Sequence, residues 1–175
     1  MITKRGFWRR ASGTVGHQAA VSRNVSTSPQ TEGIAIRPDG REVWAASNTG
    51  HVNIVDIATG TITTKLEPFG QPYRLAMSPD GKTGWFTSGS NEAGDIYYND
   101  KIFLVPAAGG AARILLPDVP YEASNAQWSK DGKTIFFLAN LGVHDEILKV
   151  DVASRQVTPI TKGDHALGSV ASDVI

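Results

Sequence analysis

The sequence contains no cysteine and no excess of charge of either sign. Without cysteine, disulfides, thiolate nucleophiles and thiolate-bound zinc or iron–sulfur sites are excluded. The 175 residues include 17 Lys and Arg against 17 Asp and Glu, whereas nucleic-acid-binding domains gather a basic excess on one face. We therefore expect no nucleic-acid partner. The length allows one domain with a substantial core.

Long hydrophobic runs are also missing. No apolar stretch approaches the roughly 20 residues needed to cross a bilayer, so we expect no membrane span. The N-terminal sequence MITKRGFWRRASGTVGHQAAV is basic and includes Arg9-Arg10. It lacks the apolar stretch of about 7–15 residues that a signal peptide needs, and the compartment stays open.

What the sequence does contain is a repeated phrase. IRPDGREVW at 36–44 returns as MSPDGKTGW at 77–85 and as WSKDGKTIF at 128–136. The Asp-Gly pairs lie 41 residues apart (39 to 80) and then 51 apart (80 to 131). Both intervals are close to the length of one blade of a β-propeller.

Each repeat contains four short segments rich in β-branched and aromatic residues, separated by turn-forming residues. Apolar residues occupy both alternations, as with Val43 and Ala45 against Trp44 and Ala46, so each sheet should be covered on both faces. Stacked propeller blades provide such cover. The predicted strands are 33–38, 42–47, 51–57 and 61–66; 74–79, 83–88, 101–106 and 112–117; and 125–129, 134–140, 146–152 and 156–161.

The fold class predicted is therefore all-β, an incomplete β-propeller with four-stranded antiparallel blades. We expect a poorly patterned N-terminal segment over 1–32 and blade repeats over 33–175. The blades are predicted at about 33–72, 73–123 and 124–166, with a partial one at 167–175. Three blades cannot close a ring, so self-association through open blade edges is expected.

The repeated Asp-Gly pair is typical of a turn between the first two strands of each blade. Pro presets φ at the second turn position, and Gly accepts the left-handed conformation that closes a tight hairpin. Asp39, Asp80 and Asp131 could instead be metal ligands or general bases. One hairpin-closing residue per unit is expected without any chemistry, which favours the turn.

Length variation falls between the second and third strands of each blade. These connections, at 47–51, 88–100 and 140–146, share one rim with the linkers 67–74, 117–125 and 162–166. We call this the binding rim, because loops on a rigid scaffold usually carry binding residues. The candidate residues are Asn91, Glu92, Tyr97, Tyr98, Tyr121, His144 and Asp145. A protein, peptide or glycan is the expected ligand.

Two stretches resemble known families. PDGREVWAASNTGHVNIVDIATGTI resembles the YVTN-type bacterial β-propeller repeat, and NAQWSKDGKTIFFLAN with EILKVDVASRQVTPIT resembles the TolB or PD40 repeat. The latter also builds the N-terminal propeller of prolyl-oligopeptidase-family (S9) serine peptidases. The resemblance covers about residues 33–166 and implies a periplasmic or secreted bacterial protein. The signature residues of WD40 repeats are absent.

Catalytic and cofactor sites are not predicted. A serine peptidase of the S9 type needs a Gly-x-Ser-x-Gly elbow, which the sequence lacks. The chain would then be a propeller without its catalytic domain, and this is the alternative to a binding or scaffold module. Candidate metal ligands lack the spacing of a known site, so no metal or cofactor is expected. They are His51, His144, His165, Asp95 and Asp100, with Asn99 added for calcium.

Aromatic residues outside the candidate site receive structural roles. Phe69 and Tyr73 lie beside prolines and are expected to fill gaps between blade ends. Trp44, Trp85 and Trp128 occupy strand positions and are expected in the core between blades.

Overall fold

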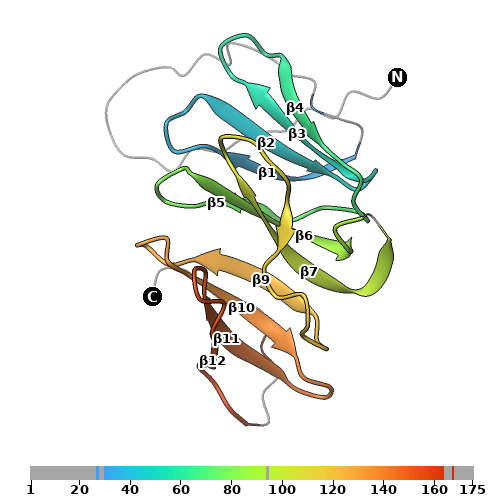
Figure 1. Ribbon diagram of the computed structural model, residues 1–175, viewed down its shortest axis with the longest axis vertical. Helices are drawn as coiled ribbons and strands as arrows, with labels where there is room; N and C mark the ends of the chain where they lie inside the picture. Colours follow the sequence, from blue (N-terminus) through green and yellow to red (C-terminus); the bar gives the residue numbers. More distant parts are fainter. Residues whose placement is uncertain (1–26, 28–29, 94, 164–166, 168–175) are drawn as a thin grey trace.

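Twelve strands form three four-stranded antiparallel sheets in a computed structural model that describes residues 27, 30–93, 95–163 and 167. The sheets have the strand orders β1-β2-β3-β4, β5-β6-β7-β8 and β12-β11-β10-β9 (Figure 1). They correspond to the predicted units and are called blades 1, 2 and 3. The strands are β1 (Thr31–Ile36), β2 (Glu42–Ser47), β3 (His51–Asp56), β4 (Ile62–Leu66), β5 (Leu75–Met77), β6 (Thr83–Ser90), β7 (Ile96–Pro106), β8 (Arg113–Ile114), β9 (Ala123–Trp128), β10 (Thr134–Asn140), β11 (Asp145–Asp151) and β12 (Val157–Pro159).

The predicted all-β fold class is confirmed. The bounds of β2 and β10 coincide with the prediction, and no helix occurs among the described residues. Most of the expected N-terminal segment 1–32, and the partial blade at 167–175 apart from Leu167, lie outside the described residues. The division into these segments stays a prediction.

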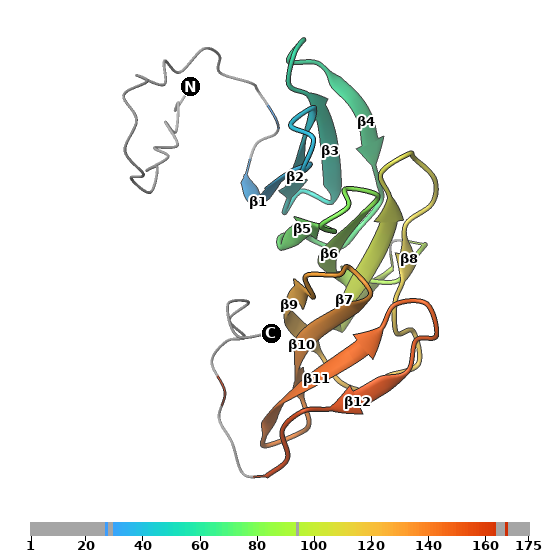
Figure 2. The same ribbon diagram turned by 90° about the vertical axis from the view of Figure 1, so that its left-hand side faces the viewer.

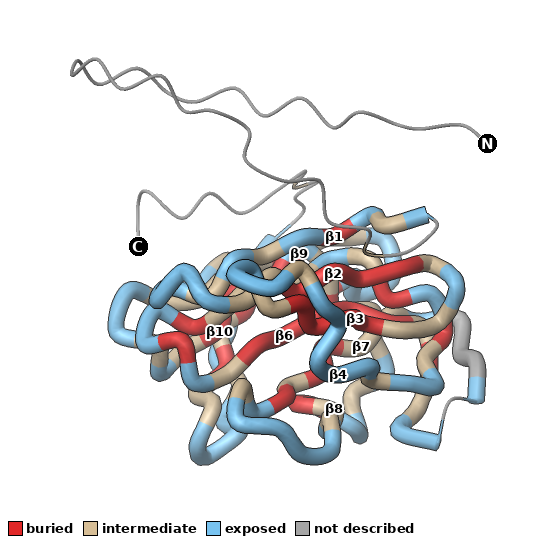
Figure 3. Tube along the Cα trace, turned by 90° about the horizontal axis from the view of Figure 1, so that it is seen from above, coloured by how far each residue is buried: buried red, intermediate tan, exposed pale blue. Residues whose placement is uncertain are grey.

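The blades stack face to face. In Figure 2 the first strands β1, β5 and β9 follow one another along one side of the molecule, and β4, β8 and β12 lie on the opposite side. The middle strands carry most of the buried positions, as the red segments of Figure 3 show. Each blade therefore consists, in chain order, of an inner strand, two buried middle strands and an outer strand.

Blades 1 and 2 are joined by one hydrophobic cluster. Trp44 of β2 and Ile54 of β3 pack there with Phe86 of β6 and Phe103 of β7. The rings of Phe86 and Phe103 stack with centroids 5.1 Å apart. Phe69, in the linker between the blades, meets both rings edge-on, at 4.7 and 5.4 Å. The expected gap-filling role of Phe69 is confirmed.

Blades 2 and 3 are joined by a second cluster. Trp85 of β6 packs there with Ile135 and Phe137 of β10, and Trp128 is packed against it. Trp85 therefore serves one interface while its neighbour Phe86 serves the other. This opposed placement explains why the strands are apolar on both alternations. Trp44 and Trp85 are confirmed as core residues, and Trp128 is partly buried against the second cluster.

The outer face of blade 3 carries a third, smaller cluster. Phe136 and Leu138 are buried there, with Ile147 and Leu167 packed against them. Self-association through open blade edges stays a prediction.

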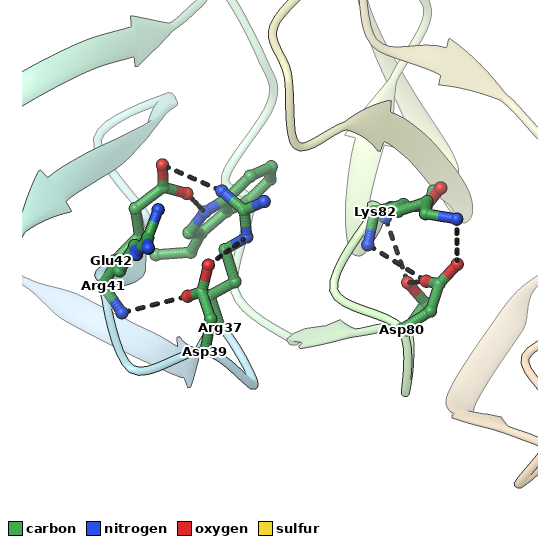
Figure 4. A network of polar contacts seen from close by, with 9 residues as sticks. Arg37, Asp39, Arg41, Glu42, Asp80 and Lys82 are labelled. Carbon is green, nitrogen blue, oxygen red and sulfur yellow. Dashed lines mark hydrogen bonds and ion pairs between the residues drawn. The ribbon is translucent and has the colours of Figure 1, made fainter.

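The repeated Asp-Gly pair closes the first hairpin of each blade. Gly40, Gly81 and Gly132 all adopt left-handed backbone angles, with φ of 72°, 69° and 70°. Asp80 Oδ1 accepts hydrogen bonds from the Lys82 amide at 3.0 Å and from the Ser78 hydroxyl at 2.7 Å (Figure 4). The Ser78 hydroxyl, followed by the Lys82 amide, lowers the pKa of Asp80.

The other two turns repeat this arrangement. Asp131 accepts from the Lys133 amide and the Ser129 hydroxyl, and its pKa is lowered by the same two bonds. In the first turn, where Arg37 replaces the serine, Asp39 accepts from the Arg41 amide and pairs with Arg37 Nε at 3.4 Å (Figure 4). All three aspartates thus shape the turn, as expected.

Successive turns also touch each other. A Cβ built on Gly81 would lie 3.1 Å from Pro38 Cδ of the preceding turn, and one on Gly132 would lie 3.4 Å from Pro79 Cδ. The proline of each turn therefore packs against the glycine of the next. This contact gives the Pro-Asp-Gly phrase a second role, in the stacking of neighbouring blades.

Candidate binding surface

The connections predicted to share one rim do lie on one side of the molecule, and binding through this rim stays a prediction. The β2–β3, β6–β7 and β10–β11 connections all lie on the right-hand side of Figure 1, and the Asp-Gly turns lie on the left. The linkers between blades approach the same rim: the Phe69 amide donates to Gly50 O at 3.0 Å, and the Gly89 amide donates to Gly70 O at 3.1 Å. These two bonds tie the first linker to the β2–β3 and β6–β7 connections, and the Asn140 amide, which donates to Glu122 O at 3.2 Å, ties the second linker to the β10–β11 connection.

The longest predicted loop, 88–100, is for the most part strand, so that prediction was wrong. β6 continues to Ser90 and β7 already begins at Ile96. Ser88 pairs with Lys101 and Ser90 pairs with Ile96, so two steps along β6 face five along β7. An irregularity of this kind accommodates extra residues without ending the pairing. Tyr97 and Tyr98 therefore belong to β7 and not to a loop.

The tip of this hairpin is held by its own polar side chains. Asn91 Oδ1 accepts from the amides of Ala93 and Asp95, at 2.9 and 2.8 Å, and Asn91 Nδ2 donates to Asp95 Oδ2 at 2.9 Å. Glu92 Oε1 accepts from the Ile114 amide at 2.7 Å, which ties the tip to β8. These three residues thus shape the hairpin, and their expected contacts with a ligand or metal stay predictions.

The base of β7 is bonded to the linker between blades 2 and 3. Lys101 Nζ donates to Val119 O at 2.6 Å, and Asn99 Nδ2 lies 3.5 Å from Pro120 O. Tyr121 stacks on Phe137, with ring centroids 6.4 Å apart. The structure thereby brings two predicted rim residues, Asp100 and Tyr121, to the same junction.

Asp100 is the most perturbed carboxyl of this junction. It is half-buried, and burial, followed by the negative charge of Glu122, raises its pKa from 3.8 to about 6. Burial also lowers the pKa of Lys101 and raises that of Tyr121. The junction therefore changes charge close to neutral pH.

Replacing Asp100 with Asn should stabilise the protein near neutral pH and not in acid. The folded state holds the Asp100 proton more tightly than the unfolded state, so stability is lost as pH rises from about 4 to about 6. After allowance for solvent screening, about 1 kcal/mol should remain, or roughly 2–4 °C in Tm. Thermal unfolding at pH 4 and pH 7.5 measures the effect.

Glu122→Gln is the matched control for Asp100. Because burial is the larger cause of the raised pKa of Asp100, Glu122→Gln should reduce the pH dependence of the stability without removing it. An Asp100→Asn protein that gains as much Tm at pH 4 as at pH 7.5 would contradict the assignment.

The candidate metal ligands do not come together. His51 Nδ1 lies 3.3 Å from Thr49 Oγ1, and burial, then the charge of Lys65, lowers the pKa of His51 against a weaker opposing effect of Glu67. His144 lies at the other end of the stack, in the β10–β11 turn. The described residues hold no group of three His, Asp or Glu side chains able to bind a metal. His165 lies outside them.

Two aliphatic side chains of the rim were missed in the sequence. Leu141 and Val143, in the β10–β11 turn beside Asp145, are 45% and 88% exposed. The Leu141 amide donates to His144 O at 2.8 Å, and the Gly142 amide donates to Asn140 Oδ1 at 3.2 Å. A glycine between two apolar residues in a polar loop was the available signal. The turn presents both side chains on a fixed backbone.

Below this turn a buried carboxylate fixes the last described linker. Glu146 is only 6% exposed. Its Oε1 accepts from the Gly163 amide at 2.8 Å, and the Thr161 hydroxyl donates to its Oε2. Glu146 therefore serves the framework of the rim.

Known structures establish what this architecture is. The chain superposes on hydrazine synthase of Kuenenia stuttgartiensis with a TM-score of 0.63 at 21% identity, over 81% of this chain and 40% of that one. It superposes on the β-propeller domain of Cps50 (Swd1) from Myceliophteria thermophila with a TM-score of 0.63 at 16% identity, over 85% and 46%. The fold is a β-propeller. A putative TolB from Agrobacterium tumefaciens gives a TM-score of 0.60 at 21% identity, over 78% and 48%.

One curated relative is similar in sequence to this propeller. Dipeptidyl-peptidase 5 of Porphyromonas gingivalis is 26% identical over 160 residues, which make up 87% of this chain and 23% of that protein. No protein-family model matches. The propeller spans less than half the length of each of these proteins. The described residues contain no helix that is long and apolar enough to cross a membrane.

Proposed function

We propose that this propeller is a non-catalytic binding module that recognises a protein or peptide through the binding rim. The observation that carries the proposal is the exposure of Leu141 and Val143 on a turn fixed by two hydrogen bonds. Exposed aliphatic side chains can pack against apolar side chains of a protein partner. Their burial contributes most to the binding free energy when the surface does not have to be ordered on binding.

The rest of the rim supports this proposal through its rigidity. Phe69 anchors the first linker in the core, Lys101 bonds the second to β7, and Glu146 bonds the third to blade 3. Loops held in this way lose little conformational freedom when a partner binds. Two polar residues lie in or beside the apolar turn, His144 and Asp145, and Tyr121 lies at the junction next to it. These three residues would supply polar contacts of the rim.

Substitution of Leu141 and Val143 tests the proposal. Peptides selected from a phage-displayed library on the full chain should bind the Leu141→Ser/Val143→Ser protein at least 10-fold more weakly, which corresponds to about 1.4 kcal/mol. Surface plasmon resonance with immobilised peptides measures the change. The substitutions lie on an exposed turn, so the fold should be kept.

Ile62→Ser is the matched control. Ile62 is 49% exposed on the outer strand β4, at the end of blade 1 remote from the rim. Selected peptides should bind this variant as they bind the original protein. Equal binding to both variants, or a loss confined to Ile62→Ser, would overturn the proposal.

A second candidate function follows from the similarity to dipeptidyl-peptidase 5. In that case the chain is the propeller portion of a prolyl-oligopeptidase-like serine hydrolase, with blade 3 of the TolB or PD40 type and blade 1 of the YVTN type. The distinguishing observation is the gene: a Gly-x-Ser-x-Gly segment in frame beyond the codon of Ile175 supports it, and a stop codon without one refutes it.

A further inference from the structure

A groove opens between the inner strands of blades 2 and 3. It has a volume of about 260 Å³ and is lined by Arg74, Leu75, Ala76, Trp85, Asn125, Ala126 and Gln127. The volume is below the roughly 300–1,000 Å³ of pockets for drug-sized ligands. A ligand of this groove is therefore small, or enters with one end only.

The charge of the groove is positive. Arg74 is exposed at the beginning of β5, and none of the ion pairs among the described residues involves it. No residue of the lining is acidic. A guanidinium offers several N–H donors in a planar fork and binds carboxylates with two parallel hydrogen bonds.

Trp85, one of the residues that line the groove, carries a hydrogen-bond donor without an acceptor among the described residues. Trp85 is 5% exposed, and its Nε1 is buried without a hydrogen-bond partner in the described part of the chain. Trp44 differs, because its Nε1 donates to Glu42 Oε2 at 3.2 Å. Buried donors are normally paired, and an unpaired one points to a missing acceptor. The nearby Trp128 Nε1 is unpaired in the same sense.

The wall of the groove formed by β9 is irregular. Phe136 pairs with Gln127 and Leu138 with Ser124, so β9 has one residue more than β10 at this point. Asn125, in the extra stretch, adopts a left-handed conformation with φ of 48°. Bulges of this kind redirect side chains and are frequent next to binding sites. The bulge lies at the groove, on the strand that faces Arg74.

We propose that this groove binds a carboxylate carried on a small group, with Arg74 as the charged partner and Trp85 Nε1 as a donor. The carboxylate belongs either to a free small acid or to the C-terminal residue of a peptide, since the groove has room for one residue. Side-chain amides of Asn125 and Gln127 supply further polar contacts. The site does not include Leu141 and Val143, and the inference does not rest on the binding of a partner by the β10–β11 turn.

Indole N–H signals in a ¹H–¹⁵N correlation spectrum of the full chain test this site. Acetyl-Ala-Ala with a free carboxylate should shift the Trp85 indole signal in a saturable manner and leave that of Trp44 unchanged. The C-terminal amide of the same peptide should bind at least 10-fold more weakly. Trp85→Phe identifies the signal. Acetate in a parallel titration distinguishes the source: equal affinity assigns a free acid, and weaker affinity assigns a peptide terminus.

Two arginine variants complete the experiment. Arg74→Gln should weaken carboxylate binding at least 10-fold, whereas Arg41→Gln, at an exposed arginine of the first Asp-Gly turn, should bind as before. The spectra of both variants report whether the fold is kept. Equal affinity for the acid and the amide, unchanged binding by Arg74→Gln, or equal shifts of the Trp44 and Trp85 signals would each overturn the proposal.

Discussion

Phe103→Ala should lower the free energy of unfolding by about 3–5 kcal/mol, the range for removal of a buried aromatic ring. Phe103 is 0% exposed and stacks on Phe86, with Phe69 against its edge. Because these rings pack in one cluster with Trp44 and Ile54 of blade 1, the cavity would open at the interface and not within one sheet. Urea unfolding followed by far-ultraviolet circular dichroism measures the loss.

Phe103→Leu serves as the control, since leucine fills much of the space and should cost less than half as much. A loss below about 1 kcal/mol for Phe103→Ala would mean that blades 1 and 2 do not share a packed core in solution.

Gly33→Ala should cause the second-largest loss of stability among the predicted substitutions, after Phe103→Ala. A Cβ at Gly33 would lie 1.9 Å from the carbonyl oxygen of Tyr73, which is backbone and cannot rotate away. β1 would have to move from the linker that enters blade 2. We expect a loss of about 3 kcal/mol, at the upper end for overpacking, in urea unfolding. The hydrogen exchange of the β1 amides should rise with it.

Gly40→Ala is the comparison for Gly33. No heavy atom lies within 4 Å of a Cβ at Gly40, and the cost there comes only from the φ of 72°, about 1–2 kcal/mol. Gly33→Ala should be clearly worse than Gly40→Ala. The reverse order would show that β1 is not held against the Tyr73 backbone.

The fold could be predicted from the sequence because its signals are local. An Asp-Gly turn needs only its own residues, so Gly40, Gly81 and Gly132 marked the hairpins correctly. The contact between Pro38 and Gly81 could not be found in this way, since it joins two units and leaves no pattern within either. The stretch 88–100 was assigned to a loop because its glycines and polar residues conceal a strand pairing with a shifted register.

The candidate site could be predicted only in part, for a physical reason. Asn91 and Glu92 were expected to contact a ligand, which stays a prediction, and the sequence did not reveal that both also accept hydrogen bonds from backbone amides of the framework. The exposed aliphatic pair of the β10–β11 turn had only a weak signal in the sequence, the glycine between two apolar residues, and its solvent exposure made it recognisable. Arg74 and Asn125 are 51 positions apart in the chain, and only the stacking of β5 on β9 brings them to one groove.

The adjacent side chains Trp85 and Phe86 of β6 have a consequence for how the number of blades in such a molecule can change. Trp85 seals one interface and Phe86 the other, so the middle unit carries both complementary surfaces within one strand. A duplicated copy of that unit would meet its own parent through a surface that the molecule already uses. Growth by tandem duplication would then bring together two surfaces that each already pack against a neighbouring blade, so a change in blade number needs no new type of blade face.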